Sequence, residues 1–390
     1  MRALDVFSGI GGFSLALAGL TKTLAFCELD PDAREVLLGR MRDKHLPKAP
    51  IFPDIRALKA SDLRPIDLIM GGWPCQDMSN MGNRKGLAGA RSGLFRKIAR
   101  LARETRAGML FLENVPNMLR LGLPAVSAEL TSQGYELRWC TLPASSLGAP
   151  HVRFRTFLMA VRPGFKAAWK RLPQHRPHSW RREPVRMVLP TAARSPRAKR
   201  VMLLGNSVVP DVVRAAFVIL AGGFRVTDPV EALAARTLET SRVMAAHTAE
   251  TWQRVPTWGY CTNGQIRGIQ PPCLRTPNLR LVFDPTAFVA ERGQEPRKGT
   301  SRSPLVRTPL QAVSWSTPRL KCSGGNVPTE RGLRDLPTQV RFEARTPDRL
   351  RRGQIRPEFV EWLMGYPPGW TVLPKGHKTR EPVGYRPNKV

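Results

Sequence analysis

Residues 4–17 read LDVFSGIGGFSLAL, and this stretch decides the fold of the N-terminal part of the chain. Leu4–Phe7 is a short apolar run typical of a buried strand, and the apolar residues from Phe13 onward begin a helix. The glycines between them predict a turn in which a ligand can approach the backbone closely. By itself, the turn fits either a dinucleotide site or a plain tight turn.

The rest of the first 160 residues repeats this alternation of strand and helix. Apolar runs of strand length recur at 23–27, 66–70, 108–112 and 154–160. Ser92 to Arg106 carries apolar residues at helical spacing. The alternation predicts an α/β fold with a mostly parallel sheet and helices on both faces. From 163 to 204 the pattern changes to a basic, proline-rich loop, and Pro210 then begins a further helix.

The charge of the chain is strongly positive and unevenly distributed. Its 390 residues carry a formal net charge of +32, of which +6 falls in residues 1–150 and +26 in residues 151–390. An excess of this size favours a polyanionic partner, above all nucleic acid. A basic solvated surface is the simpler alternative.

Composition narrows the class of protein further. Hydrophobic residues make up 42% of the chain, and no apolar run approaches the ~18 residues of a membrane span. The chain begins directly with a strand and shows no signal-peptide pattern, so we expect an intracellular protein with no membrane partner. The six cysteines form no C-x-x-C pair and the six histidines complete no zinc pattern, so we expect free thiols and no metal.

Reactive side chains stand at the ends of predicted strands, where ligand sites open in parallel sheets. Cys75 follows one such strand, and a thiol exposed there among basic groups can act as a nucleophile. Glu113 follows the next, where a buried carboxyl can stay protonated. Arg153 and Arg155 stand two apart at a strand start, so their side chains should point the same way. The ordinary alternatives are an inert cysteine, an acid at a helix start and surface arginines.

Two further acids fit a nucleotide pocket. Glu28 ends the second strand, where nucleotide-binding folds place an acid against ribose hydroxyls. Asp54 lies where a third strand should end. A surface acid at Glu28 and a turn aspartate at Asp54 are the alternatives.

Together these blocks resemble the cytosine-5 DNA methyltransferases. The blocks are DVFSGIGGF at 5–13, Glu28, Asp54, GGWPCQ at 71–76, RKGLAGARSGLF at 84–95, ENV at 113–115, RFR at 153–155 and GNSVVP at 205–210. The resemblance is close over about 1–160. It implies a Rossmann-like, S-adenosylmethionine-dependent methyltransferase sheet, with a smaller irregular basic domain beside it.

The resemblance also implies a role for each site residue. Cys75 would add to carbon 6 of cytosine, and Glu113 would engage ring nitrogen 3 and the exocyclic amine. Arg153 and Arg155 would hold the flipped base, while Asn114 would brace the site. The loop from Gln76 to Arg91 would close over the DNA. The cofactor S-adenosyl-L-methionine would be bound by Phe7, Gly9, Gly11, Gly12, Glu28, Asp54, Ile55, Pro74, Leu94 and Asn206.

The chain departs from the usual order of the family. The GNSVVP block normally comes last, after a helix with a Gly-Phe-Pro ending, but here it comes early, at 205–210. The related helix, PEFVEWLMGYPPGW, comes late, at 357–370. This rearranged order resembles phage-like enzymes. His151 stands where the family often has glutamine.

The displaced blocks suggest a division of the chain. We expect a catalytic domain at 1–224, with a basic loop at 163–204 and a closing helix at 205–222, then a target-recognition region at 225–370 that contains the late helix, and a tail at 371–390.

Double-stranded DNA is the expected partner, and we expect a monomeric enzyme in the cytoplasm, at the nucleoid, of a phage or virus host. The nearest alternative is an RNA cytosine-5 methyltransferase, against which the long basic region at 225–356 argues. A nicotinamide enzyme would leave the PCQ and ENV blocks unexplained. A basic DNA-binding protein with a decayed catalytic domain would not retain Cys75, Glu113 and both arginines.

Overall fold

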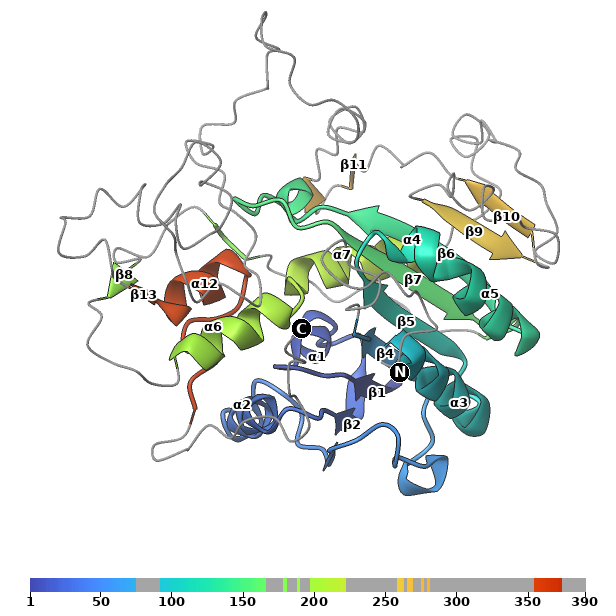
Figure 1. Cartoon of the computed structure of the whole chain (residues 1–390), viewed down its shortest axis with the longest axis horizontal. Helices are drawn as coiled ribbons and strands as arrows, with labels where there is room; N and C mark the ends of the chain where they lie inside the picture. The colour runs from blue at the N-terminus through green and yellow to red at the C-terminus, as the bar shows by residue number, and fades with distance from the viewer. Residues whose placement is uncertain are drawn as a thin grey trace, which may run out of the picture.

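A nine-stranded sheet organises the part of the chain that the structure describes (Figure 1). The structure is a computed structural model, and it describes residues 1–74, 92–165, 178–180, 188–189, 197–221, 258–262, 265–268, 275–276, 279–280 and 354–373. The strands of the sheet are β1 (Arg2–Val6), β2 (Lys22–Cys27), β3 (Ile51–Phe52), β4 (Leu68–Gly72), β5 (Met109–Asn114), β6 (Glu136–Leu142), β7 (Arg155–Val161), β9 (Gly259–Thr262) and β10 (Gln265–Gly268). Their order across the sheet is β10-β9-β6-β7-β5-β4-β1-β2-β3.

The half of the sheet from β3 to β5 is parallel, as the sequence predicts. Each neighbouring pair in this half, β2–β3, β1–β2, β1–β4 and β4–β5, runs in the same direction. The chain moves from β1 outward to β2 and β3, and then returns to place β4 on the other side of β1. This reversal puts a topological switch point between β1 and β4, and ligand sites open at the carboxyl ends of strands there.

The other half of the sheet is antiparallel, which the prediction of a mostly parallel sheet did not anticipate. β7 lies between β5 and β6 and runs opposite to both, and β9 and β10 extend the edge beyond β6. A helical crossover is needed to bring a strand back parallel. Between β6 and β7 the chain holds only the short 3-10 helix η4 (Ala144–Leu147), so β7 returns antiparallel.

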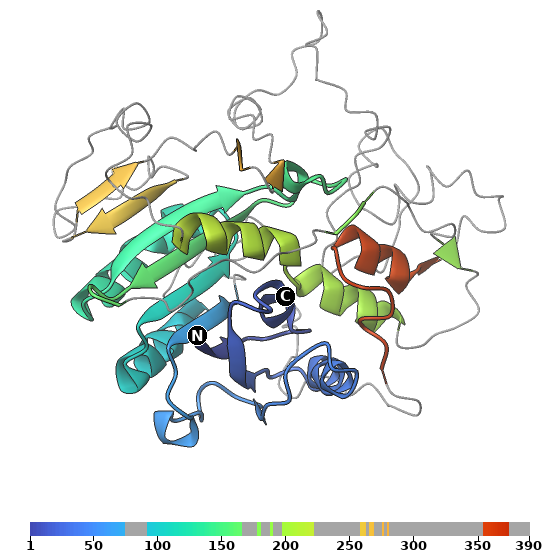
Figure 2. The same cartoon turned by 180° about the vertical axis from the view of Figure 1, so that it is seen from behind.

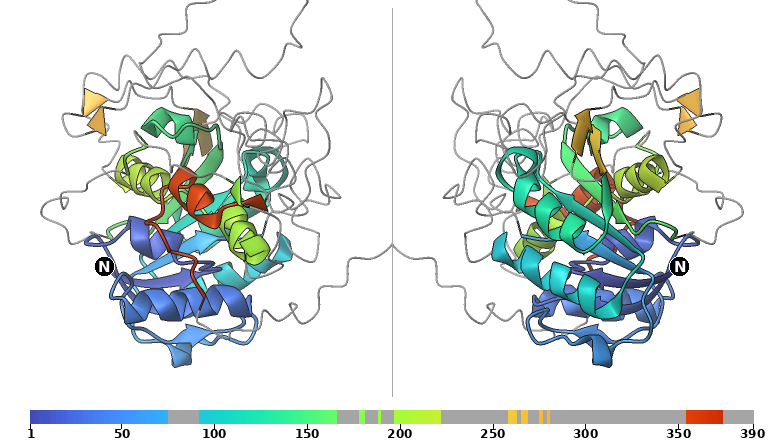
Figure 3. Two further views of the ribbon diagram at one scale, coloured as in Figure 1. Left: turned by 90° about the vertical axis from the view of Figure 1, so that its left-hand side faces the viewer. Right: turned by 90° about the vertical axis from the view of Figure 1, so that its right-hand side faces the viewer.

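Helices cover both faces of the sheet (Figure 3). One face is packed by α3 (Phe95–Thr105), α4 (Met118–Leu121) and α5 (Leu123–Ser132), and the other by α1 (Gly12–Ala16), α2 (Pro31–Arg42) and α7 (Pro210–Ala221). Strand residues alternate between these two cores: Leu110 and Leu112 of β5 join the first, and Met109 and Phe111 the second. Both faces of the sheet are therefore buried, which leaves the ends of the strands as the places where a functional site can open.

The prediction of a basic loop over 163–204 is wrong in its last part, where α6 (Arg197–Asn206) forms a helix. Val201, Leu203 and Leu204 of this helix are buried, and Lys199 forms ion pairs of 2.8 and 3.0 Å with Asp30 and Asp32 of the distant α2 region. The acids that neutralise this basic helix come from other parts of the chain, so the local sequence reads as a loop. One stretch of the described residues, Arg197–Ala221, is long and apolar enough by composition to cross a membrane, and 83% of its most apolar window is buried within the protein.

Parts of the region predicted at 225–370 pack onto the catalytic domain. β9 pairs with β6, and α12 (Pro357–Leu363) lies beside α6 (Figure 2). β13 (Gln354–Ile355) pairs with β8 (Val188–Leu189), and β11 (Arg275–Thr276) pairs with β12 (Leu279–Arg280). Thr371, placed in the predicted tail, is buried. Residues 222–257 and 281–353, most of the basic loop and the chain after 373 lie outside the described residues.

Candidate active site

The turn after β1 lies at the switch point of the sheet and contains several left-handed residues. Phe7, Gly9 and Gly11 have φ values of 51°, 52° and 83°. A Cβ atom on Gly9 would meet no atom of the described residues within 4 Å, so the backbone borders open space there. A Cβ on Gly12 would instead collide with the side chain of Tyr366. The turn therefore offers its backbone to a ligand on one side and is packed against protein on the other.

Glu28 follows β2 and is fixed beside this turn. Its two carboxylate oxygens accept hydrogen bonds from the backbone N–H groups of Gly9 and Asp30, each at 2.7 Å. Burial raises the pKa of Glu28, and the same two N–H groups oppose the rise. Each oxygen can accept a second hydrogen bond, so the carboxyl can still take two hydroxyl donors. Its neighbour Leu29 is 60% exposed, and the sequence pattern did not single out this apolar side chain.

Asp54 and Ile55 stand in the turn after β3. The Asp54 carboxylate accepts hydrogen bonds from the backbone and side chain of Arg56, and Nη2 of Arg56 lies 2.7 Å from Oδ2. This arginine lowers the pKa of Asp54. Ile55 is buried, and its carbonyl oxygen accepts a hydrogen bond of 3.0 Å from Arg100. Asp54 is therefore already engaged by a neighbour, whereas Ile55 belongs to the core beneath α3.

The chain leaves β4 through Trp73, two residues before Cys75. Trp73 is buried, and its ring centroid lies 5.5 Å from that of Phe95. Its carbonyl oxygen accepts a hydrogen bond of 3.2 Å from Nδ2 of Asn114, at the end of β5. Asn114 therefore braces the turn that leads to the thiol. Cys75 itself and the loop at 76–91 lie outside the described residues.

Glu113 and Arg155 form an ion pair across neighbouring strands. Nε of Arg155 lies 2.8 Å from Oε1 of Glu113, and the two side chains are 21% and 11% exposed. Burial raises the pKa of Glu113, while the charges of Arg155 and Arg153 oppose the rise. The other carboxyl oxygen faces Gly72 of β4, where a Cβ atom would lie 2.5 Å from Oε2. A carboxyl held in this way can give or share a proton beside the strand that leads to the predicted nucleophile.

Arg153 has different partners from Arg155. β7 begins at Arg155, so the strand alternation that predicts a common direction does not extend back to Arg153. The buried Arg153 side chain donates from Nη2 to the carbonyl oxygens of Gly205 and Ser207, at 3.0 and 2.7 Å. Arg153 thereby ties the RFR block to the GNSVVP block.

His151 is buried in the loop that precedes both arginines. Neither of its ring nitrogens has a hydrogen-bond partner among the described residues. Burial, reinforced by the positive charges of Arg153 and Arg155, lowers its pKa to about 3. The ring is therefore neutral at pH 7 and offers one donor and one acceptor, as the glutamine side chain expected from the family also does.

The remaining predicted residues lie around this same edge. Pro74 is half-buried after β4, Leu94 is half-buried in the turn before α3, and Asn206 is exposed at the end of α6. The structure thus brings together the turn after β1, Glu28 and the Glu113–Arg155 pair. No group of three His, Cys, Asp or Glu side chains that could hold a metal is present among the described residues.

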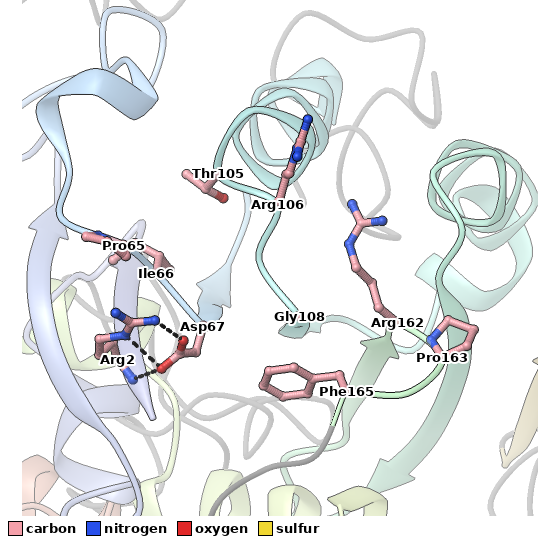
Figure 4. A pocket seen from close by; sticks show the side chains of 10 residues that line it. All are labelled: Arg2, Pro65, Ile66, Asp67, Thr105, Arg106, Gly108, Arg162, Pro163 and Phe165. Atoms are coloured by element: carbon pink, nitrogen blue, oxygen red, sulfur yellow. Dashed lines mark hydrogen bonds and ion pairs between the residues drawn. The ribbon is translucent and has the colours of Figure 1, made fainter.

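A separate cavity of about 420 Å³ lies at the opposite edge of the sheet (Figure 4). It is lined by residues at the starts of β1, β4 and β5, and Arg2 in its wall is ion-paired with Asp67 at 2.6 Å. Ligand sites of parallel sheets open at the carboxyl ends of the strands. This cavity is therefore distinct from the candidate active site.

A partly parallel sheet with a glycine-containing turn and a fixed acid at its switch point is the architecture of Rossmann-like folds that bind nucleotides. A family model described as C-5 cytosine-specific DNA methylase matches residues 1–189. The chain is 30% identical over 378 residues to the type II methyltransferase M.CviJI of Paramecium bursaria Chlorella virus IL3A, covering 94% of this chain and 96% of that protein. It is also 38% identical over 170 residues to M2.BsuMI of Bacillus subtilis strain 168, and 30% identical over 167 residues to M.HhaI of Haemophilus parahaemolyticus. Those two matches cover 41% and 42% of this chain, and 42% and 49% of the relatives.

The chain belongs to the C-5 cytosine-specific DNA methylase family. It is a DNA cytosine-5 methyltransferase, and its methyl donor is S-adenosylmethionine.

Proposed function

We propose that this enzyme methylates a cytosine flipped out of duplex DNA and that Cys75 is its covalent nucleophile. The observation that carries the proposal is the Glu113–Arg155 pair, a buried carboxyl 2.8 Å from a guanidinium beside the strand that leads to Cys75. The hydrogen bond from Asn114 to the carbonyl of Trp73 supports it, because that bond fixes the chain just before the thiol.

The turn after β1 fits the nucleoside cofactor of the family. Open space at Gly9 admits a ligand against the backbone, and Glu28 is fixed with acceptor capacity left for two ribose hydroxyls. The exposed side chain of Leu29 would add an apolar contact for the adenine ring. We assign the rest of the pocket to Phe7, Gly11, Gly12, Asp54, Ile55, Pro74, Leu94 and Asn206.

Covalent addition by the thiolate solves the main chemical difficulty, which is that carbon 5 of cytosine is a poor nucleophile. Sγ of Cys75 bonds to carbon 6, and the electrons of the carbon 5–carbon 6 double bond move onto carbon 5. S-adenosylmethionine would supply an electrophilic methyl group to carbon 5, and S-adenosylhomocysteine would leave as the methyl–sulfur bond breaks. Loss of the carbon 5 proton to water or a neighbouring base restores the double bond and expels Cys75 as the thiolate.

Glu113 would stabilise the negative charge that the ring gains when Cys75 adds. A protonated carboxyl donates to ring nitrogen 3 and then shares or gives up its proton as that nitrogen gains charge. Burial raises the pKa of Glu113 and favours its protonated form, whereas the charges of Arg155 and Arg153 oppose this rise. Arg155 would orient this carboxyl, and Arg153 would hold residues 205–207 against the strand edge so that Asn206 borders the cofactor.

The distribution of charge supports duplex DNA as the partner, because residues 151–390 carry a net charge of +26. The target base must leave the stack to reach the site, at a cost of a few kcal/mol that contacts to the phosphate backbone offset. We assign target recognition to 225–356, which lies mostly outside the described residues. The enzyme would act as a monomer on DNA inside the cell.

Expression in a host that lacks cytosine methylation, followed by bisulfite sequencing, tests this function. We expect protected cytosines within one short recurring sequence, and none with the Cys75→Ala variant. A folded protein that binds the cofactor but leaves genomic DNA unmodified would contradict the proposal. So would methylation found in transfer RNA instead of DNA.

A further inference from the structure

The late helix and the turn that follows it fold back behind the cofactor turn. Nε1 of Trp370 donates a hydrogen bond of 2.8 Å to the carbonyl oxygen of Ile10, which stands between Gly9 and Gly11. Tyr366 packs against Gly12 so closely that a Cβ atom there would collide with it. The far end of the chain therefore supports the turn on the side away from the open space at Gly9.

A network of buried polar groups holds this supporting segment in one conformation. Glu361 is fully buried and accepts hydrogen bonds from the backbone N–H groups of Gly369 and Thr371, at 2.7 and 2.8 Å. Arg200 of α6 lies 3.0 Å from the same carboxyl, and Arg40 of α2 donates to the carbonyl of Gly369 at 3.2 Å. Contacts from two helices thus hold Trp370 in place, and its hydrogen bond to Ile10 in turn holds the cofactor turn.

The cofactor turn needs such support because of its composition. The glycines on both sides of Ile10 can adopt many backbone conformations, and Gly9 and Gly11 both occupy the left-handed region. Without the indole N–H, the buried carbonyl of Ile10 would lose this donor, and the peptide could rotate to seek another. A turn that samples other conformations must be ordered again when a ligand binds, which lowers affinity.

We propose that Trp370 is a positioning residue for cofactor binding, so that the displaced C-terminal block sets the affinity of the N-terminal turn for its nucleoside ligand. The proposal rests on the assignment of the turn after β1 to the cofactor. It also gives a role to the contacts that the late block at 357–370 makes with the catalytic domain.

The test compares Trp370→Phe with Trp362→Phe in the full-length protein. Both changes remove an indole N–H from a buried tryptophan of the same segment, but Nε1 of Trp362 has no hydrogen-bond partner among the described residues. Binding of S-adenosylhomocysteine is measured by calorimetry, and KM for each substrate and kcat by methyl transfer. Hydrogen exchange of a peptide spanning residues 8–17 reports the turn without any ligand.

We expect Trp370→Phe to weaken binding of S-adenosylhomocysteine roughly fivefold to thirtyfold, which corresponds to about 1–2 kcal/mol. The KM for the methyl donor should rise similarly, kcat and the KM for DNA should stay near wild type, and exchange in the turn should speed up. Trp362→Phe should match wild type in all of these. Equal effects of the two variants, or unchanged binding by Trp370→Phe, would overturn the inference and leave the function standing. Failure of the wild-type protein to bind S-adenosylhomocysteine would instead overturn the cofactor assignment.

Discussion

The Glu113–Arg155 pair can be tested by replacing Arg155 with methionine, which keeps much of the side-chain length and removes the charge. Breaking a buried pair by removing one partner costs about 3–5 kcal/mol, because the other charge stays buried without compensation. The Arg155 side chain is 21% exposed, so solvent screens part of this loss. We therefore expect Arg155→Met to lower the free energy of unfolding by about 2–3 kcal/mol.

A double-mutant cycle isolates the interaction. Urea unfolding at pH 7 would be measured for wild type, Arg155→Met, Glu113→Gln and the double variant, with an expected coupling energy of about 1–2 kcal/mol. Arg2→Met, which breaks the more exposed pair with Asp67, is the matched control and should cost far less. Additivity of the two single changes within about 0.5 kcal/mol would refute the pair.

The pH dependence of stability in these four proteins tests the pair independently. A carboxyl whose pKa is raised in the folded protein keeps its proton longer than in the unfolded chain, so stability falls as pH rises from its ordinary pKa to its raised one. Arg155 opposes the rise for Glu113, so Arg155→Met should extend that fall to higher pH. The extension should vanish when Glu113 is also glutamine, and its persistence would mean that another group titrates.

Three further predictions concern neighbouring residues. Burial raises the pKa of Asp5 to about 7, so the free energy of unfolding of the wild type should fall as pH rises from 4 to 7. Asp5→Asn should flatten this pH dependence in urea unfolding, and an unchanged dependence would show that Asp5 is not its source. Gly72→Ala should lower the free energy of unfolding by about 1–3 kcal/mol, because the new methyl group overpacks against Glu113, and it should slow single-turnover methylation. A stability and a rate equal to those of the wild type would contradict this contact. His151→Gln should keep methylation within roughly threefold of wild type from pH 6 to 8, because both side chains are neutral donor–acceptor groups; a ratio that changes with pH would show that the histidine titrates there.

The parallel half of the fold was predictable because its strands are continuous apolar runs with both faces buried. LDVF at 4–7 and GMLFL at 108–112 identify β1 and β5 to within one or two residues. β6 escaped prediction because Glu136 and Arg138 interrupt its apolar residues at partly exposed positions. α6 read as a loop because its basic residues are neutralised by acids far away in the chain, such as the pair from Arg200 to Glu361.

The site was predictable where it depends on strand ends and unpredictable where it depends on long-range contacts. Glu113 is the last residue but one of β5 and Arg155 begins the neighbouring strand β7, so the sheet brings them together. The bonds of Arg153 to residues 205–207 and of Trp370 to Ile10 join segments whose separation in sequence carries no periodic signal. The nucleophile stays a prediction from the PCQ block, since Cys75 lies outside the described residues.

Covalent trapping on DNA tests the central claim most directly. Duplex DNA that contains 5-fluorocytosine at the target position carries fluorine in place of the proton that must leave carbon 5, so elimination of the thiolate is blocked. With S-adenosylmethionine, the wild-type enzyme should form a complex that survives denaturation, and mass mapping should place the bond on Cys75. An adduct that persists in Cys75→Ala, or that maps to another cysteine, would contradict the assignment.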